Sequence, residues 1–338
     1  MHSPAFSAAR TAAPAPQSLP QHTPLVAAVR DGLVESIHYG SAVALDADGT
    51  PVATAGDPDA PFYPRSSLKP LQAVAMVRAG LELPADLLAL AAASHSGATE
   101  HRDGALRILE LHGLSITDLE NSTDLPYGTS EREDWLRGGG STTQLTQNCS
   151  GKHAAMAATC VINGWPVRGY LHPEHPLQQL ARDTITGLTG EEPTAVSTDG
   201  CGTPLFALTL HGMARAFGRI ARAAALDDAS AEAAVGLAIQ HHPNMVAGEG
   251  RDVTELIRRL PGAVAKDGFE GVQLVGLADG SAVAVKISDG GDRARMPATV
   301  RLLEALGVDP APLASIATAP VLGGGHQVGL LQATDFLN

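Results

Sequence analysis

Alternating apolar and polar residues at both ends of this chain constrain its fold more than any other feature. Between Pro24 and Ala55 the chain reads PLVAAVRDGLVESIHYGSAVALDADGTPVATAG, with Asp-Gly turns typical of hairpins between antiparallel strands. From Gly271 the segment GVQLVGLADGSAVAVKISDG repeats this pattern around Asp279 and Gly280, and GGGHQVGLLQATDF predicts a closing strand. We therefore expect strands at both ends of the fold.

The middle of the chain has the apolar spacing of helices instead. Residues 66–113 contain LQAVAMVRAG and DGALRILELHG, two runs that each end at a glycine suited to cap a helix. Further helices are predicted over 152–159, 176–188, 203–218 and 228–241. A helical part at about 66–260, between strands, predicts an α+β fold in which N- and C-terminal strands share one antiparallel sheet packed with the helices.

The length of 338 residues fits one large domain better than several independent modules. No linker that could separate domains follows residue 24, so we expect a single domain over 24–338. The first 23 residues, MHSPAFSAARTAAPAPQSLPQHT, are rich in Ala, Pro and Gln and predict a flexible arm. They lack the basic start and compact apolar stretch of a secretory signal.

Composition argues against two classes of partner. The net charge of −13 leaves no basic surface for phosphates, so we expect no nucleic acid. No apolar run reaches the roughly 18 residues that a membrane span needs, so we expect no membrane. Three cysteines, at positions 149, 160 and 201, are too few for a disulfide framework and fit a reducing compartment. We therefore expect a cytoplasmic protein.

Lysine is scarce in a chain that otherwise uses arginine. Of the 23 basic residues 19 are arginines, and the four lysines are Lys69, Lys152, Lys266 and Lys286. A buried lysine can lose its proton near neutral pH, whereas arginine cannot. Each lysine therefore either has a chemical role or is present by chance.

The segment YPRSSLKPLQ places Ser66 and Lys69 one turn apart at the predicted start of a helix. A serine hydroxyl becomes a nucleophile when a base takes its proton, and a neutral lysine amine is that base in Ser-x-x-Lys hydrolases. The same spacing also arises by chance, with the serine capping a helix and the lysine solvated. Pro70 favours a first-turn position for Lys69.

Polar residues also gather in three other segments. ASHSGATEH contains Ser94, either in a ligand-facing turn or in an ordinary helix cap. HHPNMVAGEGRDVTEL contains Arg251, which either holds a substrate carboxylate or pairs with an aspartate of its own loop. KDGFEGV places Lys266 in a glycine-flanked turn from which it can reach inward. Lys286, on the predicted strand AVAVKIS, is compatible with simple solvent exposure.

NCSGKHAAM and STDGCGTPLFA carry two cysteines that could converge on a metal. Cys149 lies with Lys152 and His153 before a predicted helix, and Asp199 lies with Cys201 in a glycine-rich turn. Two thiolates and a nitrogen donor are a credible ligand set for zinc. There is no CxxC spacing, however, and a lysine ligand must first lose its proton. Spacing alone therefore does not predict a metal site.

Seven elements in one order resemble the signature series of the L-asparaginase II family, the rhizobial or class 3 type. They are RSSLKPLQ, ASHSG, NCSGKHAAM, STDGCGTPLFA, HPNMVAGEGR, KDGFEGV and AVKISDGG. The resemblance runs from about residue 24 to the end, and the ordered series is far more specific than any one element. It implies a fold like that of serine β-lactamases and glutaminases, L-asparagine as substrate, and a homodimer.

The resemblance also implies roles for individual residues. The catalytic pairs are Ser66 with Lys69 and Ser94 with Lys266, and either serine could attack the side-chain amide. The zinc ligands are Cys149, Lys152 and Cys201, with the metal serving structure or substrate positioning. The substrate-binding candidates are Arg65, His153, Asp199 and Arg251. The chain departs from the family pattern at Phe269, where alanine is expected, and a bulky ring there could narrow the pocket.

Two other functions remain open. One is a glutaminase or a related serine amidohydrolase, although the Ser-Asp-Asn and Lys-Thr-Gly elements of penicillin-recognising enzymes are absent from the sequence. The other is a non-catalytic amino-acid sensor that keeps the pocket without turnover. Retention of all four Ser-Lys residues argues against a sensor. Ammonia release from asparagine and glutamine separates these functions.

Overall fold

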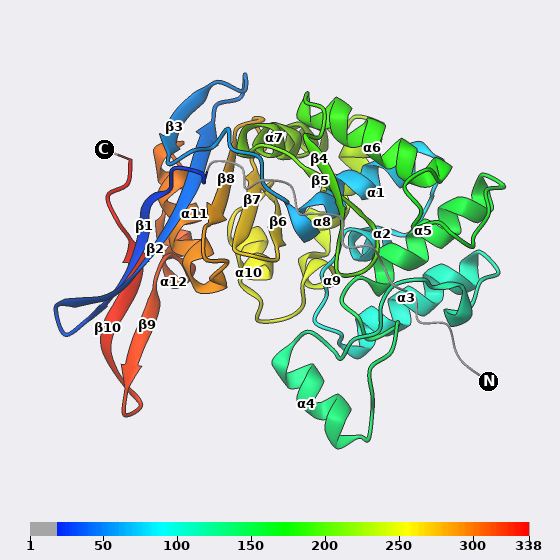
Figure 1. Ribbon diagram of the computed structural model, residues 1–338, viewed down its shortest axis with the longest axis horizontal. Coiled ribbons are helices and arrows are strands. Elements are labelled where there is room, and N and C mark those ends of the chain that lie inside the picture. The colour runs from blue at the N-terminus through cyan, green and yellow to red at the C-terminus, as the bar shows by residue number, and fades with distance from the viewer. Residues whose placement is uncertain (1–18, 338) are drawn as a thin grey trace, which may run out of the picture.

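The structure is a computed structural model that describes residues 19–337. An antiparallel sheet of N- and C-terminal strands lies on one side of the molecule, and helices fill the other side (Figure 1). This arrangement confirms the predicted α+β fold. Within the described residues, no helix combines the length and the apolar character that crossing a membrane requires.

The large sheet has eight strands, in the order β6-β7-β8-β2-β1-β10-β9, with β3 paired to β2. Their bounds, with those of a separate β4-β5 hairpin, are β1 Thr23–Arg30, β2 Leu33–Leu45, β3 Pro51–Ala55, β4 Ala195–Thr198, β5 Pro204–Ala207, β6 Val264–Gly268, β7 Val272–Gly276, β8 Ala282–Ile287, β9 Ala319–Gly323 and β10 His326–Ala333. Strands β1 and β10 pair with Val26 opposite Ala333, so the two ends of the chain meet in one sheet. Asp31 and Gly32 both have positive φ, as a type I′ hairpin between β1 and β2 requires.

Helices occupy most of the region between β3 and β6. The α-helices are α1 Lys69–Arg78, α2 Ala85–Ala91, α3 Thr99–Leu111, α4 Thr129–Arg137, α5 Ser150–Ile162, α6 Pro176–Thr189, α7 Leu210–Leu226, α8 Ala231–His241, α9 Pro243–Val246, α10 Asp252–Arg259, α11 Arg295–Ala305 and α12 Ala314–Ala317. Four 3-10 helices complete the set: η1 Arg65–Leu68, η2 Ile116–Asp118, η3 Asp292–Ala294 and η4 Ala311–Leu313. The predicted helical part is thus largely confirmed.

One helix was predicted to begin too early in the sequence. Residues 203–209 do not begin the helix expected over 203–218, because Pro204–Ala207 form strand β5 against β4. The helix α7 starts at Leu210, where the side chain of Thr209 accepts a hydrogen bond from the backbone N–H of Gly212 and caps the first turn. A four-residue apolar run has no periodicity that distinguishes a strand from a helix, which explains the error.

The strands nearest the helices are enclosed on both faces. Every residue of β6 and β7 is buried. Helix α7 packs against β7 and β8, and α11 packs against β8 and β2. A Cβ at Gly276 would lie 2.1 Å from the carbonyl oxygen of Phe217, so glycine lets the α7 backbone approach β7 directly. The polar residues of β6 are therefore shielded from solvent.

The predicted domain boundaries meet the described residues only in part. Residues 1–18 of the predicted arm lie outside the described residues, and Thr23 already belongs to β1. We propose that residues 24–338 form a single domain. The pairing of β1 with β10 supports this proposal, because it joins the first and last strands in one sheet.

Candidate active site

The four residues expected to be catalytic come from three separate segments. Ser66 lies in η1 and Lys69 begins α1, Ser94 follows α2, and Lys266 lies on β6. Ser66 and Ser94 line a small cavity of about 20 Å³. The other residues that line it are Tyr127, Asn148, Asp267, Gly268, Phe269 and Asp292. The fold thus brings both predicted serines to one enclosed space.

An unusual backbone conformation leads into Ser66. Arg65 has φ of 55°, in the left-handed region that non-glycine residues rarely adopt. Its Nε donates a hydrogen bond to Asp199 Oδ1 at 2.7 Å, and its guanidinium lies 5.1 Å from the ring centre of Phe269. These contacts hold the strained residue and fix where η1 begins, which orients Ser66 toward the cavity.

Lys69 is buried in the wall behind the two serines. Its side chain is 1% exposed, and Nζ donates to the carbonyl oxygen of Ala93 at 2.6 Å and to Ser94 Oγ at 2.9 Å. Ser66 is half-buried, and within residues 19–337 no protein group hydrogen-bonds to its hydroxyl. The structure therefore places the Lys69 amine against Ser94 and leaves the Ser66 hydroxyl open to a ligand.

Lys266 is fully buried but is paired with its neighbour in sequence. Its Nζ donates to the main-chain oxygen of Asp267 at 2.9 Å and forms an ion pair with the Asp267 carboxylate. Burial lowers the pKa of Lys266 to about 8, the charge of Lys69 adds to this lowering, and Asp267 opposes it. No hydrogen bond between Lys266 and Ser94 occurs in the described part of the chain.

Asp267 is the central acid of this site. Arg251 Nη2 donates to Asp267 Oδ2 at 2.9 Å, so the carboxylate joins Lys266 to Arg251. Burial alone would raise the pKa of Asp267, but the charges of Lys266, Arg251 and Arg295 hold it well below its usual range. Asp267 is therefore an anion that neutralises buried cations beside the cavity. Sequence reasoning missed it, although its position next to Lys266 was a visible signal.

The two arginines expected to bind substrate flank the cavity in similar ways. Arg251 lies 4.8 Å from the ring centre of Tyr127, as Arg65 lies over Phe269. Each arginine also pairs with one aspartate, Arg65 with Asp199 and Arg251 with Asp267. Arg251 Nη1 is buried without a hydrogen-bond partner in the described residues. Arg251 does not pair with an aspartate of its own loop among the described residues, because its partner Asp267 lies on β6 and Asp252 pairs with Arg295. The unused Nη1 leaves Arg251 a donor for a substrate carboxylate.

The cysteine segments converge as a buried cluster. Cys149, Cys201 and Lys152 are 3%, 2% and 1% exposed. Lys152 Nζ donates to Cys201 Sγ at 3.2 Å and to Thr203 Oγ1 at 3.0 Å. The hydrogen bond from the Cys149 thiol, with the charge of Lys152, lowers the pKa of Cys201 against the opposing effect of burial. Cys201 is therefore the thiolate of the cluster, the form of cysteine that binds metals.

The donors of this cluster suit zinc chemically. Two thiols and an amine offer sulfur and nitrogen ligands, and His153 Nε2 is buried beside them without a hydrogen-bond partner among the described residues. No group of three or more His, Cys, Asp or Glu side chains in the described ranges could hold a metal. Because Lys152 is the nitrogen donor of the predicted ligand set, zinc binding by that set requires Lys152 to be deprotonated.

Asp199 and His153 connect the cluster to its surroundings. Besides accepting from Arg65, Asp199 has Oδ2 at 3.8 Å from Cys201 Sγ. His153 Nδ1 lies 2.9 Å from the hydroxyl of Tyr170. Asp199 thereby links the arginine beside the cavity to the cysteine cluster, so the two parts of the site form one continuous network.

Three more cavity residues, Tyr127, Asn148 and Asp292, were not singled out from the sequence. Tyr127 precedes the projecting helix α4, and Asn148 precedes Cys149 (Figure 1). Asp292 begins η3, shortly after strand β8. Asn148 opens the quoted segment NCSGKHAAM but was given no role there, and no local pattern distinguishes Tyr127 or Asp292 from solvated polar residues.

Comparison with known families gives this geometry its context. Residues 26–333 of the 338-residue chain match the family described as L-asparaginase II. No curated protein sequence matches the chain. The family match spans β1 to β10 and includes each segment that lines the cavity. A match over this length shows that the protein is a member of the L-asparaginase II family, an amidohydrolase of the asparaginase type.

Proposed function

We propose that this enzyme hydrolyses L-asparagine to L-aspartate and ammonia by Ser-Lys nucleophilic catalysis. The observation that carries the proposal is the 2.9 Å contact between Lys69 Nζ and Ser94 Oγ in the wall of a cavity that Ser66 also lines. This contact places the Lys69 amine beside the cavity, where it can serve as the base for a serine hydroxyl that lines the cavity. Membership of the family supports asparagine as the amide.

In this proposal Ser66 attacks the amide carbon. Its hydroxyl is open to a ligand, whereas Ser94 is 3% exposed and already bonded to Lys69. Lys69, as a neutral amine, takes the proton of Ser66. The described residues show no Lys69–Ser66 hydrogen bond, so this contact has to form when substrate binds. Backbone N–H groups would hold the developing oxyanion. Water then hydrolyses the aspartyl ester.

Ser94 and Lys266 serve proton transfer to the leaving ammonia. Ser94 bridges from Lys69 toward the cavity, and Lys266 adds a second buried amine whose pKa of about 8 permits proton exchange near neutral pH. Arg65 and Arg251 are the proposed partners of the substrate α-carboxylate, with Asp199 and His153 positioning the site. The unused Nη1 donor of Arg251 supports this role.

The cavity must open to accept asparagine. A volume of about 20 Å³ holds one water molecule but not an amino acid. Phe269, at the turn between β6 and β7, has 53% of its surface exposed. We propose that the turn carrying Phe269 moves when substrate binds. The ring that departs from the family pattern would then border the opening.

Zinc is part of the proposal through Cys149, Lys152 and Cys201. When bound there, zinc would neutralise the thiolates and fix the loop that presents Asp199 to Arg65. This role is structural or positional, and none of the proton transfers above depends on it. We also propose a homodimer in the cytoplasm. The three buried free cysteines, without a disulfide among the described residues, suit a reducing compartment.

The first test is ammonia release from purified protein given L-asparagine or L-glutamine, with zinc content measured on the same sample. We expect faster release from asparagine, about one zinc per chain, and a loss of at least about a hundredfold in Ser66→Ala. Faster release from glutamine would favour the glutaminase alternative. Asparagine binding without ammonia release would favour the amino-acid sensor, and near-normal turnover by Ser66→Ala would reject Ser66 as the nucleophile.

The lowered pKa of Lys266 predicts that the rate of the reaction depends on pH. Because burial lowers its pKa to about 8, the neutral amine is the minor form at pH 7 and the major form at pH 9. If the neutral amine is required, kcat/KM for asparagine rises with pH and levels off above about pH 8. Lys266→Met should lose this rise along with most activity. A flat profile from pH 6 to pH 9 in the wild-type enzyme would contradict a proton-transfer role for Lys266.

A further inference from the structure

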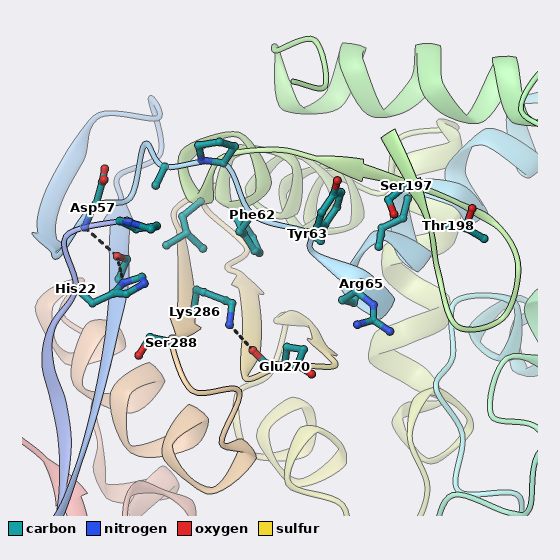
Figure 2. Close-up of a pocket in the computed structure, with 16 residues that line it drawn as sticks. His22, Asp57, Phe62, Tyr63, Arg65, Ser197, Thr198, Glu270, Lys286 and Ser288 are labelled. Carbon is teal, nitrogen blue, oxygen red and sulfur yellow. Dashed lines mark hydrogen bonds between the residues drawn. The ribbon is translucent and has the colours of Figure 1, made fainter. Parts of the chain in front are cut away.

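A second cavity of about 490 Å³ lies beside the candidate active site, and Arg65 is the one residue of its lining to which the proposed reaction gives a role (Figure 2). Its volume is within the range of about 300–1,000 Å³ typical of small-molecule sites. The apolar part of its wall includes Phe62, Leu205 and Leu210, and hydroxyls of Ser41 and Thr198 line other parts. The cavity is therefore large enough for a ligand of amino-acid size.

Lys286 is the one lysine to which the proposed reaction assigns no role, and it projects into this cavity (Figure 2). Its Nζ donates to the backbone oxygens of Glu270 at 2.7 Å and Ile287 at 2.5 Å. An ammonium has three N–H donors, so one remains for a ligand. Burial lowers the pKa of Lys286, although Glu270 and Asp289 oppose that effect.

The Lys286 ammonium lacks a counter-ion. Among residues 19–337, no carboxylate lies within ion-pair distance of its Nζ, although the side chain is half-buried. Buried charges in proteins are normally paired, because an isolated charge loses hydration without compensation. Two fixed carbonyl contacts hold the ammonium in place without neutralising it. An anionic group at the third donor would complete the site.

The remaining polar groups of the cavity suit an α-amino acid. Ser41 lies opposite Lys286 in the pairing of β2 with β8, and its hydroxyl lies 3.0 Å from His22 Nδ1. Asp57 and Glu270 line the cavity on opposite sides of Lys286 (Figure 2). A carboxylate would therefore meet Lys286, and an α-ammonium group would meet one of these two acids.

Two pairs of consecutive residues separate this cavity from the active site. Arg65 and Glu270 line the larger cavity, whereas their neighbours Ser66 and Phe269 line the catalytic one. The stacked side chains of Arg65 and Phe269 thus form the partition. A ligand in the larger cavity would lie next to the catalytic serine without contacting it.

We propose that the cavity around Lys286 is a second binding site for a free α-amino acid, separate from the catalytic cavity. Its carboxylate binds Lys286, its ammonium group binds Asp57 or Glu270, and its carbon skeleton packs against Phe62. The product L-aspartate is the amino acid that the enzyme itself supplies. Binding at this site does not require the Ser-Lys reaction, so the two proposals can fail separately.

Equilibrium dialysis with radiolabelled L-aspartate tests the site without turnover. Wild-type enzyme should bind two aspartates per chain. Lys286→Met should bind one aspartate per chain, because loss of the contact between the ammonium and the aspartate carboxylate weakens binding at the second site at least about tenfold. Arg182→Met removes one positive charge from a surface pair with Glu192 and is the matched control, expected to bind two. Asp57→Asn tests the same cavity without altering β8.

Ammonia release and thermal unfolding are measured on the same variants. A folded Lys286→Met enzyme that hydrolyses asparagine but has lost one aspartate supports the second site. Should Lys286→Met fail to fold, weaker binding of the second aspartate by Asp57→Asn supports it. One or no aspartate per wild-type chain, or two unchanged affinities in both variants, overturns it. Absence of ammonia release from wild-type enzyme would reject only the proposed reaction.

Discussion

Lys69→Met should lower kcat for L-asparagine by about a thousandfold while the protein stays folded. Methionine fills nearly the same volume in the buried wall but cannot exchange a proton with either serine. General-base catalysis contributes about 10²–10⁴-fold to such reactions, which sets the size of the expected loss. The substrate arginines are untouched, so asparagine binding should persist. The measurements are steady-state ammonia release and binding of asparagine to the inactive variant.

Lys69→Arg is the matched control for this loss. Arginine keeps the positive charge near Ser94 but cannot act as a neutral base in a protein. If Lys69 is the base, both variants are inactive; if its charge alone matters, arginine restores part of the rate. Thermal unfolding of both variants shows whether the wall keeps its packing. Turnover of Lys69→Met within tenfold of wild type would remove Lys69 from the proposed mechanism.

Much of the fold could be predicted because its ends carry unambiguous local patterns. Asp31 and Gly32 specify a hairpin turn, and Asp279 with Gly280 separate β7 from β8 as expected. Alternation at both ends and the helical middle predicted one sheet of N- and C-terminal strands, and the structure shows which of them pair, β1 with β10. The error at Pro204 arose where an apolar run was too short for periodicity to decide. Local patterns were therefore sufficient where turns bounded the strands.

The site was predictable as a set of residues but not as a set of contacts. Scarcity of lysine and the Ser-x-x-Lys spacing pointed to Ser66 and Lys69, and the family series added Ser94 and Lys266. Sequence spacing favoured contact between Ser66 and Lys69, whereas the fold directs Lys69 to Ser94 and Lys266 to Asp267. Such contacts depend on how α1, the segment after α2 and β6 pack together. No local spacing contains that information.

The cysteine cluster illustrates the same limit. Lys152 lies in the first turn of α5 and Cys149 directly precedes that helix, but Cys201 belongs to a loop between β4 and β5. Spacing alone gave no reason to bring them together, and the resemblance supplied the grouping. The structure adds the 3.2 Å contact between Lys152 and Cys201 and the buried, unpartnered Nε2 of His153. Zinc in this cluster stays a proposal for metal analysis to test.

Asp267→Asn should destabilise the protein by about 3 kcal/mol at pH 7. The asparagine side chain at position 267 has the same shape as aspartate but lacks the negative charge between Lys266 and Arg251. Removing one partner of a buried ion pair typically costs about 3–5 kcal/mol. Asp86→Asn is the matched control, because it breaks a surface pair with Arg107 and should cost less than about 1 kcal/mol. Urea unfolding followed by circular dichroism measures both changes.

The sign of the pH dependence makes this prediction specific. Asp267 raises the pKa of Lys266, so its removal lowers that pKa further below the value of about 8. Above about pH 8 Lys266 is already neutral in the wild-type protein, and only Arg251 then lacks its counter-charge in Asp267→Asn. As pH falls through 8, Lys266 of the wild-type protein becomes protonated and pairs with the Asp267 carboxylate. In Asp267→Asn, Lys266 either stays neutral or becomes a buried ammonium without a counter-charge. The stability difference should therefore be larger at pH 6 than at pH 9. Equal differences at both pH values would show that Lys266 and Asp267 do not titrate as a coupled pair.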